Sequence, residues 1–469
     1  MTGITRLEPA GRWRMGYASL FLLLIASCAV TTPGRGGLEN LPGTDAETCP
    51  AVAVQPADDR PVIDLRFELA DDRRTVSGSE TVRFTPDRTT DEMVFRLTPN
   101  QPSSVAAGSG IEVGEVTGDD VSFTGFELAG ADESTQGGLL VLGLRRALQP
   151  GESTEVVIDF RLRLGSGSFD RFGQDAQTSW WGSGHPLLAW EPGGGWRREP
   201  LVDVLGETAT SPAASTTLTV LAPPDRTVLM TGGAVRLEDD GRRALWRSSS
   251  HAARDVSVAV GDFTTAQISL DGTTVITGAA DEDAAAELLE RIGDVVVGME
   301  QYFGEFPFET LSVVRLEDYG GGIEYPAMIL LADGGDVTLA HEIAHMWFYG
   351  MVGNDQARDP WLDETFAAYA EALVNGPPEE PRQAPGGPLA VGLPISAFPD
   401  DKAYFETVYD NGAAMLDRAR EESGPEKFDA ALRCYLNANA WRIAAPKDVE
   451  TALRDLPAAL AVLREAGAL

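Results

Sequence analysis

Two histidines and a glutamate stand close together in the segment LAHEIAHMWFYG, residues 339–350. His341 and His345 are four residues apart, so on a helix both imidazoles project from one face and can bind one metal ion. Glu342 follows the first histidine directly and would lie beside the metal as a base. The alternative is a helix with two satisfied polar residues. Because the chain has only four histidines, a chance match to this spacing has a probability on the order of a few in a thousand.

A third candidate ligand, Glu364, follows His345 after a gap of eighteen residues, in the helical segment DPWLDETFAAYAEALVNG. Two imidazoles and one carboxylate leave the fourth position of a tetrahedral zinc ion open to water, as catalytic zinc sites do. This set leaves the ion about one positive charge with which to acidify that water. Glu342 can take the proton and pass it to a leaving amine. The sequence therefore predicts one Zn²⁺ ion, held by His341, His345 and Glu364.

These motifs resemble the aminopeptidase N-like family of zinc gluzincin metallopeptidases, the membrane alanyl aminopeptidase family. The resemblance rests on the zinc motif and its spacing, on HMWFYG and WLDETFAAYAE, and on GGIEYPA at residues 321–327. It implies that Glu324 binds the free α-amino group of a peptide, which would place the first peptide bond over the metal. It also gives Gly321 and Gly322 a role in substrate binding, because glycine lets backbone approach a ligand closely.

The resemblance also implies a role for a tyrosine in VYDNGAAML. Tyr409 would donate a hydrogen bond to the oxyanion of the tetrahedral intermediate. Tyr404 is the nearest alternative, and for either tyrosine simple packing is a further possibility. Asp359 or Asp363 could orient the ligand histidines, and the sequence does not choose between them.

Two blocks of sequence must position these residues. Residues 61–265 alternate apolar with polar residues, as in STEVVIDFRLRL, which predicts a β-rich antiparallel domain. Residues 266–469 change to helical spacing, beginning with DEDAAAELLERIGDVVVGMEQYF, which predicts an α+β, mainly helical domain. The resemblance spans about residues 61 to 440 and implies a saddle-like β domain followed by a thermolysin-like catalytic domain. The large helical C-terminal domain of longer members is expected to be lacking, which leaves a more open cleft.

The start of the chain has the layout of an export signal. In residues 1–28, Arg6 and Arg12 precede the apolar run GYASLFLLLIAS, which ends beside Cys28. IASC resembles a bacterial lipobox, so Cys28 is the predicted lipidation site; an ordinary cleaved signal peptide is the alternative. Residues 29–60 are rich in Pro, Gly and Thr and predict a flexible linker. The protein is therefore expected to be a cell-envelope lipoprotein, anchored at a bacterial membrane and facing outside the cytoplasm.

The charge of the chain bears on its partners. Seventy-two acidic and 37 basic residues give a formal net charge of −35. This charge repels phosphate backbones, so no nucleic-acid partner is expected. The expected partners are peptides with a free N-terminus and, through the lipid, a membrane. The sequence leaves the oligomeric state open.

The remaining cysteines and histidines are less informative. Cys49 and Cys434 could form a disulfide in an exported protein, or remain two unrelated thiols. His185 and His251 lack a partner at ligand spacing and are predicted to be surface or packing residues.

The sequence leaves three functions to compare. The leading prediction is an exported zinc aminopeptidase. Because Tyr325 stands where the family commonly has Asn after the exopeptidase glutamate, an endopeptidase with an open cleft is the first alternative. A non-catalytic, zinc-containing surface protein is the second, although a structural site does not need a base such as Glu342.

Overall fold

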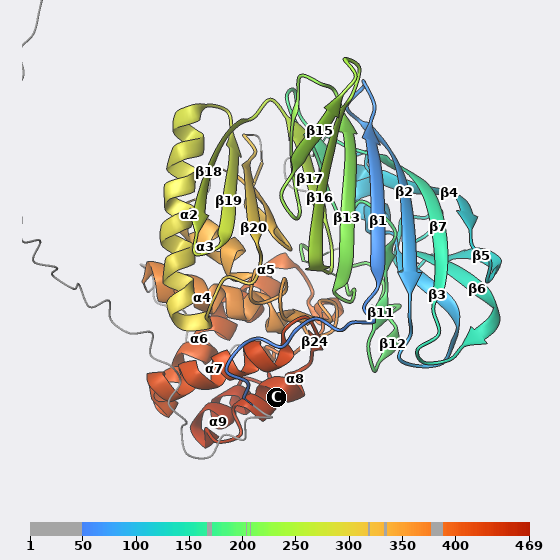
Figure 1. The fold of residues 1–469 in the computed structure, drawn as a ribbon. Helices are drawn as coiled ribbons and strands as arrows, with labels where there is room; N and C mark the ends of the chain where they lie inside the picture. The colour runs from blue at the N-terminus through green and yellow to red at the C-terminus, as the bar shows by residue number, and fades with distance from the viewer. Residues whose placement is uncertain are drawn as a thin grey trace, which may run out of the picture. The chain divides into compact units, whose positions relative to one another are not determined.

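The computed structural model describes residues 49–166, 171–202, 204–206, 208–317, 319–332, 335–376 and 388–469. The chain divides into two units, Met1–Gly43 and Thr44–Leu469, and every described residue lies in the second unit (Figure 1). The predicted export signal, its Cys28 and residues 29–48 of the predicted linker lie outside the described residues. None of the described helices has the length and apolar character needed to cross a bilayer. The predicted boundary at residue 265 stays a prediction.

A seven-stranded sheet dominates the first half of the second unit. In β7 (Thr154–Arg163) Val156, Ile158 and Phe160 are buried, and the residues between them face outward or are partly exposed. The alternation predicted from the sequence is therefore confirmed, since a strand places successive side chains on opposite faces. The sheet has the order β15-β16-β13-β1-β2-β7-β4, with β1 (Val62–Leu69), β2 (Thr75–Phe84), β4 (Gly110–Thr117), β13 (Ala214–Ala222), β15 (Val235–Asp239) and β16 (Ala244–Ala253).

The pairing in this sheet is antiparallel at every step except one. Strand β1 runs parallel to β13, with Leu65 opposite Leu218. Two further four-stranded sheets pack with it around a core that includes Phe67, Trp181 and Val258. They have the orders β10-β3-β6-β5 and β14-β17-β9-β8, and a small β11-β12 hairpin adjoins them. Their strands are β3 (Thr90–Arg96), β5 (Val121–Glu127), β6 (Leu139–Leu148), β8 (Phe172–Gln174), β9 (Ser179–Gly182), β10 (Leu187–Leu188), β11 (Trp190–Glu191), β12 (Gly195–Trp196), β14 (Thr227–Met230) and β17 (Ser257–Gly261).

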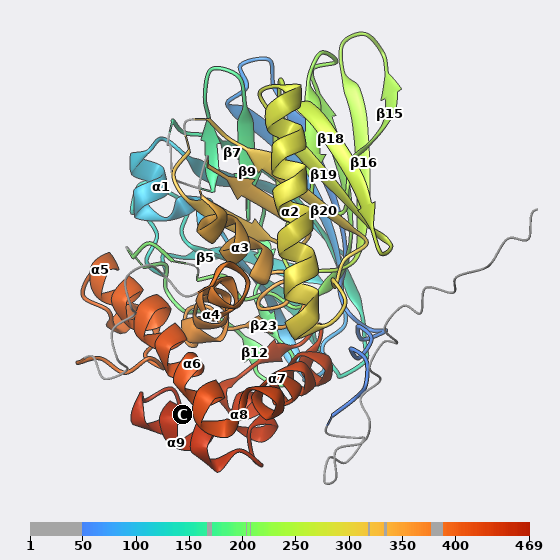
Figure 2. The ribbon, with the colours of Figure 1, turned by 90° about the vertical axis from the view of Figure 1, so that its left-hand side faces the viewer.

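The second half begins with a five-stranded sheet and a long helix. Helix α2 (Glu282–Phe303) confirms the predicted helix, and the Asp281 side chain caps it by accepting a hydrogen bond from Ala284 N. Figure 2 shows α2 lying along this sheet. The sheet order is β18-β19-β20-β22-β21, with β18 (Thr264–Leu270), β19 (Thr273–Ala279), β20 (Thr310–Arg315), β21 (Gly322–Tyr325) and β22 (Met328–Leu331). Strand β21 is one of its two edge strands, and it carries Glu324.

Helices make up most of the remainder. Helix α3 (Asp336–Ala344) carries His341 and Glu342. It packs on α4 (Glu364–Asn375), which packs on α6 (Gly412–Ser423). The π-helical segment Phe405–Asn411 precedes α6 and carries Tyr409. The remaining α-helices and strands are α1 (Pro102–Ala106), α5 (Asp401–Tyr404), α7 (Pro425–Asn439), α8 (Pro446–Ala452), α9 (Pro457–Glu465), β23 (Gly353–Asn354) and β24 (Ile443–Ala444).

A disulfide joins Cys49 to Cys434 on α7, with the two Cα atoms 4.8 Å apart. The structure thus decides between the two alternatives that the sequence left open. Two hydrogen bonds support the same contact: Val54 N donates to Asn437 O at 3.0 Å, and Asn437 Nδ2 donates to Pro50 O at 3.0 Å. The segment before β1 is therefore fastened to the last helices.

A buried arginine links the β-rich half to the helical half. The Arg254 guanidinium donates to the backbone oxygens of Ser211 at 3.0 Å, Met351 at 3.3 Å, and Gly350 and Arg442 at 3.4 Å. Burial lowers the pKa of Arg254 to about 10. Because buried carbonyl groups need hydrogen-bond donors, this one side chain stabilises the segment that follows the zinc helix.

His185 lies inside the β-rich half, where only 2% of it is exposed. Its Nδ1 lies 3.3 Å from Glu80 Oε2, and its Nε2 lies 3.7 Å from Asp255 Oδ1. Burial opposes the charged ring, but the two carboxylates outweigh it and raise the pKa of His185 to about 10. The ring is therefore an ion-paired packing residue. His251 is exposed and packs against Trp441, with ring centroids 5.2 Å apart.

Candidate active site

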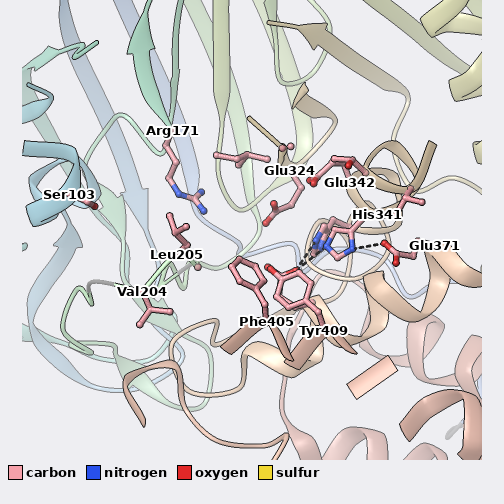
Figure 3. A pocket seen from close by; sticks show the side chains of 18 of the residues that line it. Ser103, Arg171, Val204, Leu205, Glu324, His341, Glu342, Glu371, Phe405 and Tyr409 are labelled. Carbon is pink, nitrogen blue, oxygen red and sulfur yellow. Dashed lines mark hydrogen bonds and ion pairs between the residues drawn. The ribbon is translucent and has the colours of Figure 1, made fainter. Parts of the chain in front are cut away.

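A cavity of about 540 Å³ contains all the predicted site residues of the second half (Figure 3). The β-rich half contributes to its wall as well as the helical half. The cavity is lined by Gln101, Ser103, Ala107, Arg171, Val204, Leu205, Gly206, Gly321, Gly322, Ile323, Glu324, Val337, Thr338, His341, Glu342, His345, Glu364, Glu371, Phe405 and Tyr409.

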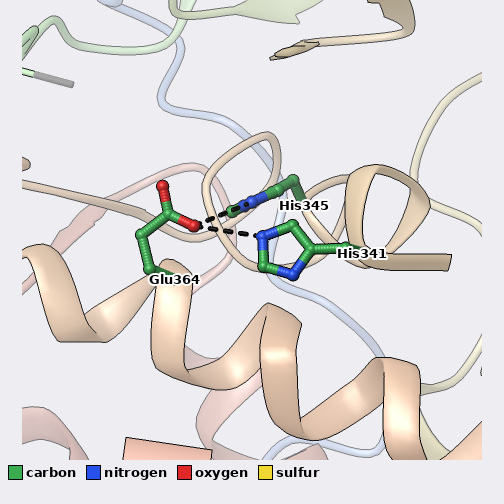
Figure 4. A group of neighbouring side chains, drawn as sticks. All are labelled: His341, His345 and Glu364. Atoms are coloured by element: carbon green, nitrogen blue, oxygen red, sulfur yellow. Dashed lines mark hydrogen bonds and ion pairs between the residues drawn. The ribbon is translucent and has the colours of Figure 1, made fainter. Parts of the chain in front are cut away.

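Three predicted ligands converge at one wall of this cavity (Figure 4). His341 Nε2 lies 3.1 Å and His345 Nε2 3.4 Å from the same oxygen, Glu364 Oε2. The three side chains are buried, and their ligand atoms all lie within 4.8 Å of one another. Helix α3 ends at Ala344, yet His345 keeps helical backbone angles, φ −61° and ψ −12°. The two imidazoles therefore still share one face, as the spacing requires.

The geometry of Glu364 comes from the start of α4. Glu364 is the first residue of this helix, and Asp363 Oδ1 accepts a hydrogen bond from its backbone N at 2.9 Å. Gln356 Nε2 donates to the other oxygen of Asp363 at 3.1 Å. Asp363 thus fixes the helix start and does not contact a ligand ring in the described interactions. Asp359 instead pairs with Arg358, 3.3 Å away.

Two other groups orient the imidazole rings of the ligand histidines. His341 Nδ1 lies 3.2 Å from Glu371 Oε2, and His345 Nδ1 lies 3.0 Å from the Phe348 carbonyl oxygen. Neither partner was predicted from the sequence. The expectation that Asp359 or Asp363 orients the ligand histidines is wrong for these contacts. Such partners fix the ring orientation of histidine ligands and leave the opposite nitrogen for the metal. Glu371 follows Glu364 by seven residues, two helical turns, and this spacing was the available signal.

The donor set fits a zinc ion. Imidazole nitrogens and a carboxylate oxygen are the ligands that zinc prefers, and three protein ligands leave one position open. Burial opposes the charged ring of His341, but Glu364 and Glu371 outweigh it and raise the pKa of His341 to about 10. His345 likewise has a raised pKa despite burial, because Glu324 and Glu364 lie near it. Such an excess of negative charge around two imidazoles attracts a dication as well as protons.

Glu342 lies beside this ligand set and is 5% exposed. Its Oε2 has no hydrogen-bond partner among the described residues. Burial, reinforced by Glu324 and Glu364, outweighs the two histidines and raises the pKa of Glu342 to about 8. A carboxylate with a pKa near neutrality suits a general base and acid. An unpaired buried carboxylate oxygen in a cavity also fits a position that meets water or substrate.

Glu324 extends into the cavity from β21 and is 4% exposed. Burial raises its pKa, and its Oε1 has no hydrogen-bond partner among the described residues. Gly321 adopts φ +79°, which favours glycine. A Cβ atom at Gly322 would lie 2.5 Å from Glu342 Cγ. Gly322 therefore lets β21 approach the base closely. It also lines the cavity, and its role in substrate binding stays a prediction.

The structure separates the two candidate tyrosines. The Tyr409 ring stacks on His341, with centroids 5.4 Å apart and planes inclined by 9°, and it lines the cavity. Tyr404 is fully buried and packs edge-on against Phe398 at 5.3 Å. Among the described lining residues Tyr409 is thus the tyrosine placed to reach a substrate.

Comparison with known proteins gives partial sequence matches. No protein-family model matches the chain. Tricorn protease-interacting factor F2 of Thermoplasma acidophilum is 25% identical over 177 residues, which cover 34% of this chain and 22% of that protein. Human endoplasmic reticulum aminopeptidase 1 is 26% identical over 196 residues, 34% of this chain and 20% of that protein. Aminopeptidase N of Lactococcus lactis is 24% identical over 198 residues, 34% of this chain and 23% of that protein. The chain spans less than a quarter of the length of these relatives.

Comparison of structures covers far more of the chain. The crystal structure of an M1 zinc metallopeptidase from Deinococcus radiodurans has a TM-score of 0.62 at 18% identity, covering 90% of this chain and 97% of that one. A two-domain M1 zinc metallopeptidase variant solved with L-arginine has a TM-score of 0.63 at 18% identity, covering 90% and 96%.

The chain therefore has the fold of the two-domain M1 zinc metallopeptidases, a β-rich part followed by a mainly helical part, as the sequence predicted. Its sequence is similar to aminopeptidases of the same kind. The resemblance to the aminopeptidase N-like family is therefore confirmed, in the sequence similarity and in the fold.

Proposed function

We propose that this protein is a zinc-dependent aminopeptidase that removes N-terminal residues from peptides. One observation carries the proposal: the ligand set His341, His345 and Glu364 shares a single cavity with two buried, incompletely paired carboxylates. A zinc site alone needs neither Glu342 nor Glu324. The similarity to aminopeptidases supports the same conclusion.

Zinc, when bound by the three ligands, supplies a Lewis acid that polarises a peptide carbonyl and acidifies water. Glu342 then takes the proton of the attacking water and delivers it to the leaving amine. Glu324 pairs with the ammonium group of the substrate, which fixes the first peptide bond at the ligand set. The Tyr409 hydroxyl donates a hydrogen bond to the carbonyl oxygen as negative charge develops on it.

The test is hydrolysis of a panel of amino-acid p-nitroanilides, each beside its N-acetylated counterpart, with and without a chelator. We expect chelator-sensitive cleavage of the free substrates and none of the acetylated ones. Glu342→Gln should lower kcat by about 100- to 10,000-fold, because proton transfer loses its base. Glu238→Gln, on the exposed strand β15, is the matched control and should leave kcat unchanged.

Two other outcomes would contradict the proposal. Equal cleavage of free and acetylated substrates would favour an endopeptidase with an open cleft. Zinc bound at one ion per chain without turnover of any substrate would favour a non-catalytic binding protein.

We also propose that the protein is exported and held at a bacterial membrane by lipid on Cys28. The support is the IASC motif after an apolar run, and the Cys49–Cys434 disulfide agrees with it, because disulfides persist outside the cytoplasm. Radiolabelled palmitate should enter the wild-type protein and not Cys28→Ser. Equal labelling of both, or of neither, would refute lipidation at this residue.

A further inference from the structure

Arg171 lies in the cavity wall on the side of the β-rich half (Figure 3). It is the only arginine or lysine among the described lining residues, whereas four glutamates line the same cavity: Glu324, Glu342, Glu364 and Glu371. Its charge is close enough to lower the pKa of Glu324 against the larger effect of burial. The proposed mechanism assigns no task to this cation.

Arg171 contacts residues of two strands, β9 and β21. Its backbone oxygen accepts a hydrogen bond from Gly182 N, at the end of β9, at 2.9 Å. Its Nη1 donates to Tyr325 Oη at 3.3 Å, and its guanidinium carbon lies 5.8 Å from the centre of the Tyr325 ring. Tyr325 is fully buried, and a Cβ atom at Gly182 would overlap its ring. Gly182 therefore leaves room for the Tyr325 ring, and Tyr325 binds the guanidinium.

The binding site of the guanidinium lies next to Glu324, the residue proposed to bind the substrate amine and called the amine anchor below. Tyr325 directly follows Glu324 on β21. In the view of Figure 3, Glu324 lies between Arg171 and His341, so the cation is on the far side of the anchor from the ligand set. A substrate with its amine on Glu324 and its first carbonyl at the ligand set directs the following residues away from Arg171. The group that reaches Arg171 is the side chain of the first residue, which starts from the same carbon as the amine.

We infer that Arg171 is a specificity-determining residue that binds the carboxylate of an acidic first residue, aspartate or glutamate, in substrates of the proposed aminopeptidase. This inference rests on the proposed function. A guanidinium presents paired donors that match a carboxylate, and the bond is strong in a partly desolvated site. A lysine or arginine as first residue would meet a like charge instead. Tyr325, a departure from the family pattern, is then the residue that positions the guanidinium.

The experiment compares kcat/KM for the p-nitroanilides of glutamate and glutamine, which differ in charge and little in shape. These substrates have no C-terminal carboxylate, so they isolate the side chain. The wild type should prefer glutamate by about 10- to 100-fold, the range of a charged hydrogen bond. Arg171→Met should reduce the ratio to about one, and Arg171→Glu should make the lysine substrate better than the glutamate substrate. Tyr325→Phe should give an intermediate ratio. Arg146→Met, at an exposed arginine paired with Glu152, should retain the wild-type ratio.

The outcomes separate the inference from the function on which it rests. Hydrolysis of neutral substrates with no preference for glutamate in the wild type would overturn the role of Arg171 and leave the aminopeptidase intact. An equal loss on all substrates in Arg171→Met would mean that the cation acts on Glu324. If Arg171→Met lost hydrolysis of free dipeptides only, and still cleaved the same dipeptides as C-terminal amides, Arg171 would instead bind the C-terminal carboxylate of the peptide. Failure of the wild type to cleave any free substrate would overturn both.

Discussion

Glu371 offers a direct test of how the zinc site is built. Its Oε2 lies 3.2 Å from His341 Nδ1, so it orients one ligand ring and makes the opposite nitrogen more basic. Replacing it by glutamine keeps an acceptor of the same length and removes the charge. Replacing it by alanine removes both.

The structure sets the size of the effect. Loss of such a partner typically lowers metal affinity by about 10- to 100-fold. The Glu371 side chain is 18% exposed and the His341 side chain 11%, so water partly screens their interaction. We therefore expect Glu371→Gln near the lower limit, about 10-fold, and Glu371→Ala near the upper limit, about 100-fold.

The assay is competition for zinc with a chromophoric chelator, followed by hydrolysis at saturating zinc. Both variants should recover much of the wild-type kcat once zinc is bound, because the proposed mechanism uses Glu371 only to orient His341. Glu422→Gln, on the exposed face of α6, is the matched control. Zinc affinity equal to that of the wild type in Glu371→Ala would refute the role of this contact.

Three further predictions concern stability. Arg254→Met removes the side-chain donor of the buried Ser211 and Gly350 carbonyl oxygens and should lower the free energy of unfolding by about 3 kcal/mol, measured in urea; a change near zero would contradict the linking role. The folded pKa of His185, about 10, exceeds its unfolded value of about 6.5, so its stabilisation is complete below pH 6.5 and is lost as the pH rises through 10. His185→Gln should therefore destabilise more at pH 6 than at pH 10, and an equal effect at both would refute the ion pairing. Cys434→Ser opens a loop of 385 residues and should cost about 4 kcal/mol, with no further loss on adding reductant; a variant as stable as the wild type would contradict the disulfide.

The ligand set could be predicted because it depends on local spacing. His341 and His345 share a helical face whatever surrounds them, and Glu364 starts the next helix at a spacing that the family resemblance supplies. The orienting contacts could not be predicted in the same way. Glu371 meets His341 only because α4 packs on α3, and this packing depends on side chains far from either motif.

The same limit applies to the fold. Alternation in β7 and the cap of α2 are local signals, and the structure confirms both. The parallel pairing of β1 with β13 joins strands that lie far apart in the sequence, and alternation does not specify a partner. The contact between Arg171 and Tyr325 could not be predicted from the sequence for the same reason. They are separated by 154 positions and meet because β9 and β21 approach each other at Gly182.

The most direct test of the proposed zinc aminopeptidase is a titration of zinc-free protein with zinc, in which bound metal and hydrolysis of leucine p-nitroanilide are measured on the same samples. We expect activity that starts from zero and rises in proportion to bound zinc up to one ion per chain, and Glu364→Gln should neither retain that zinc nor become active. Activity that persists without zinc, or one bound zinc per chain with no hydrolysis of any free substrate, would contradict it.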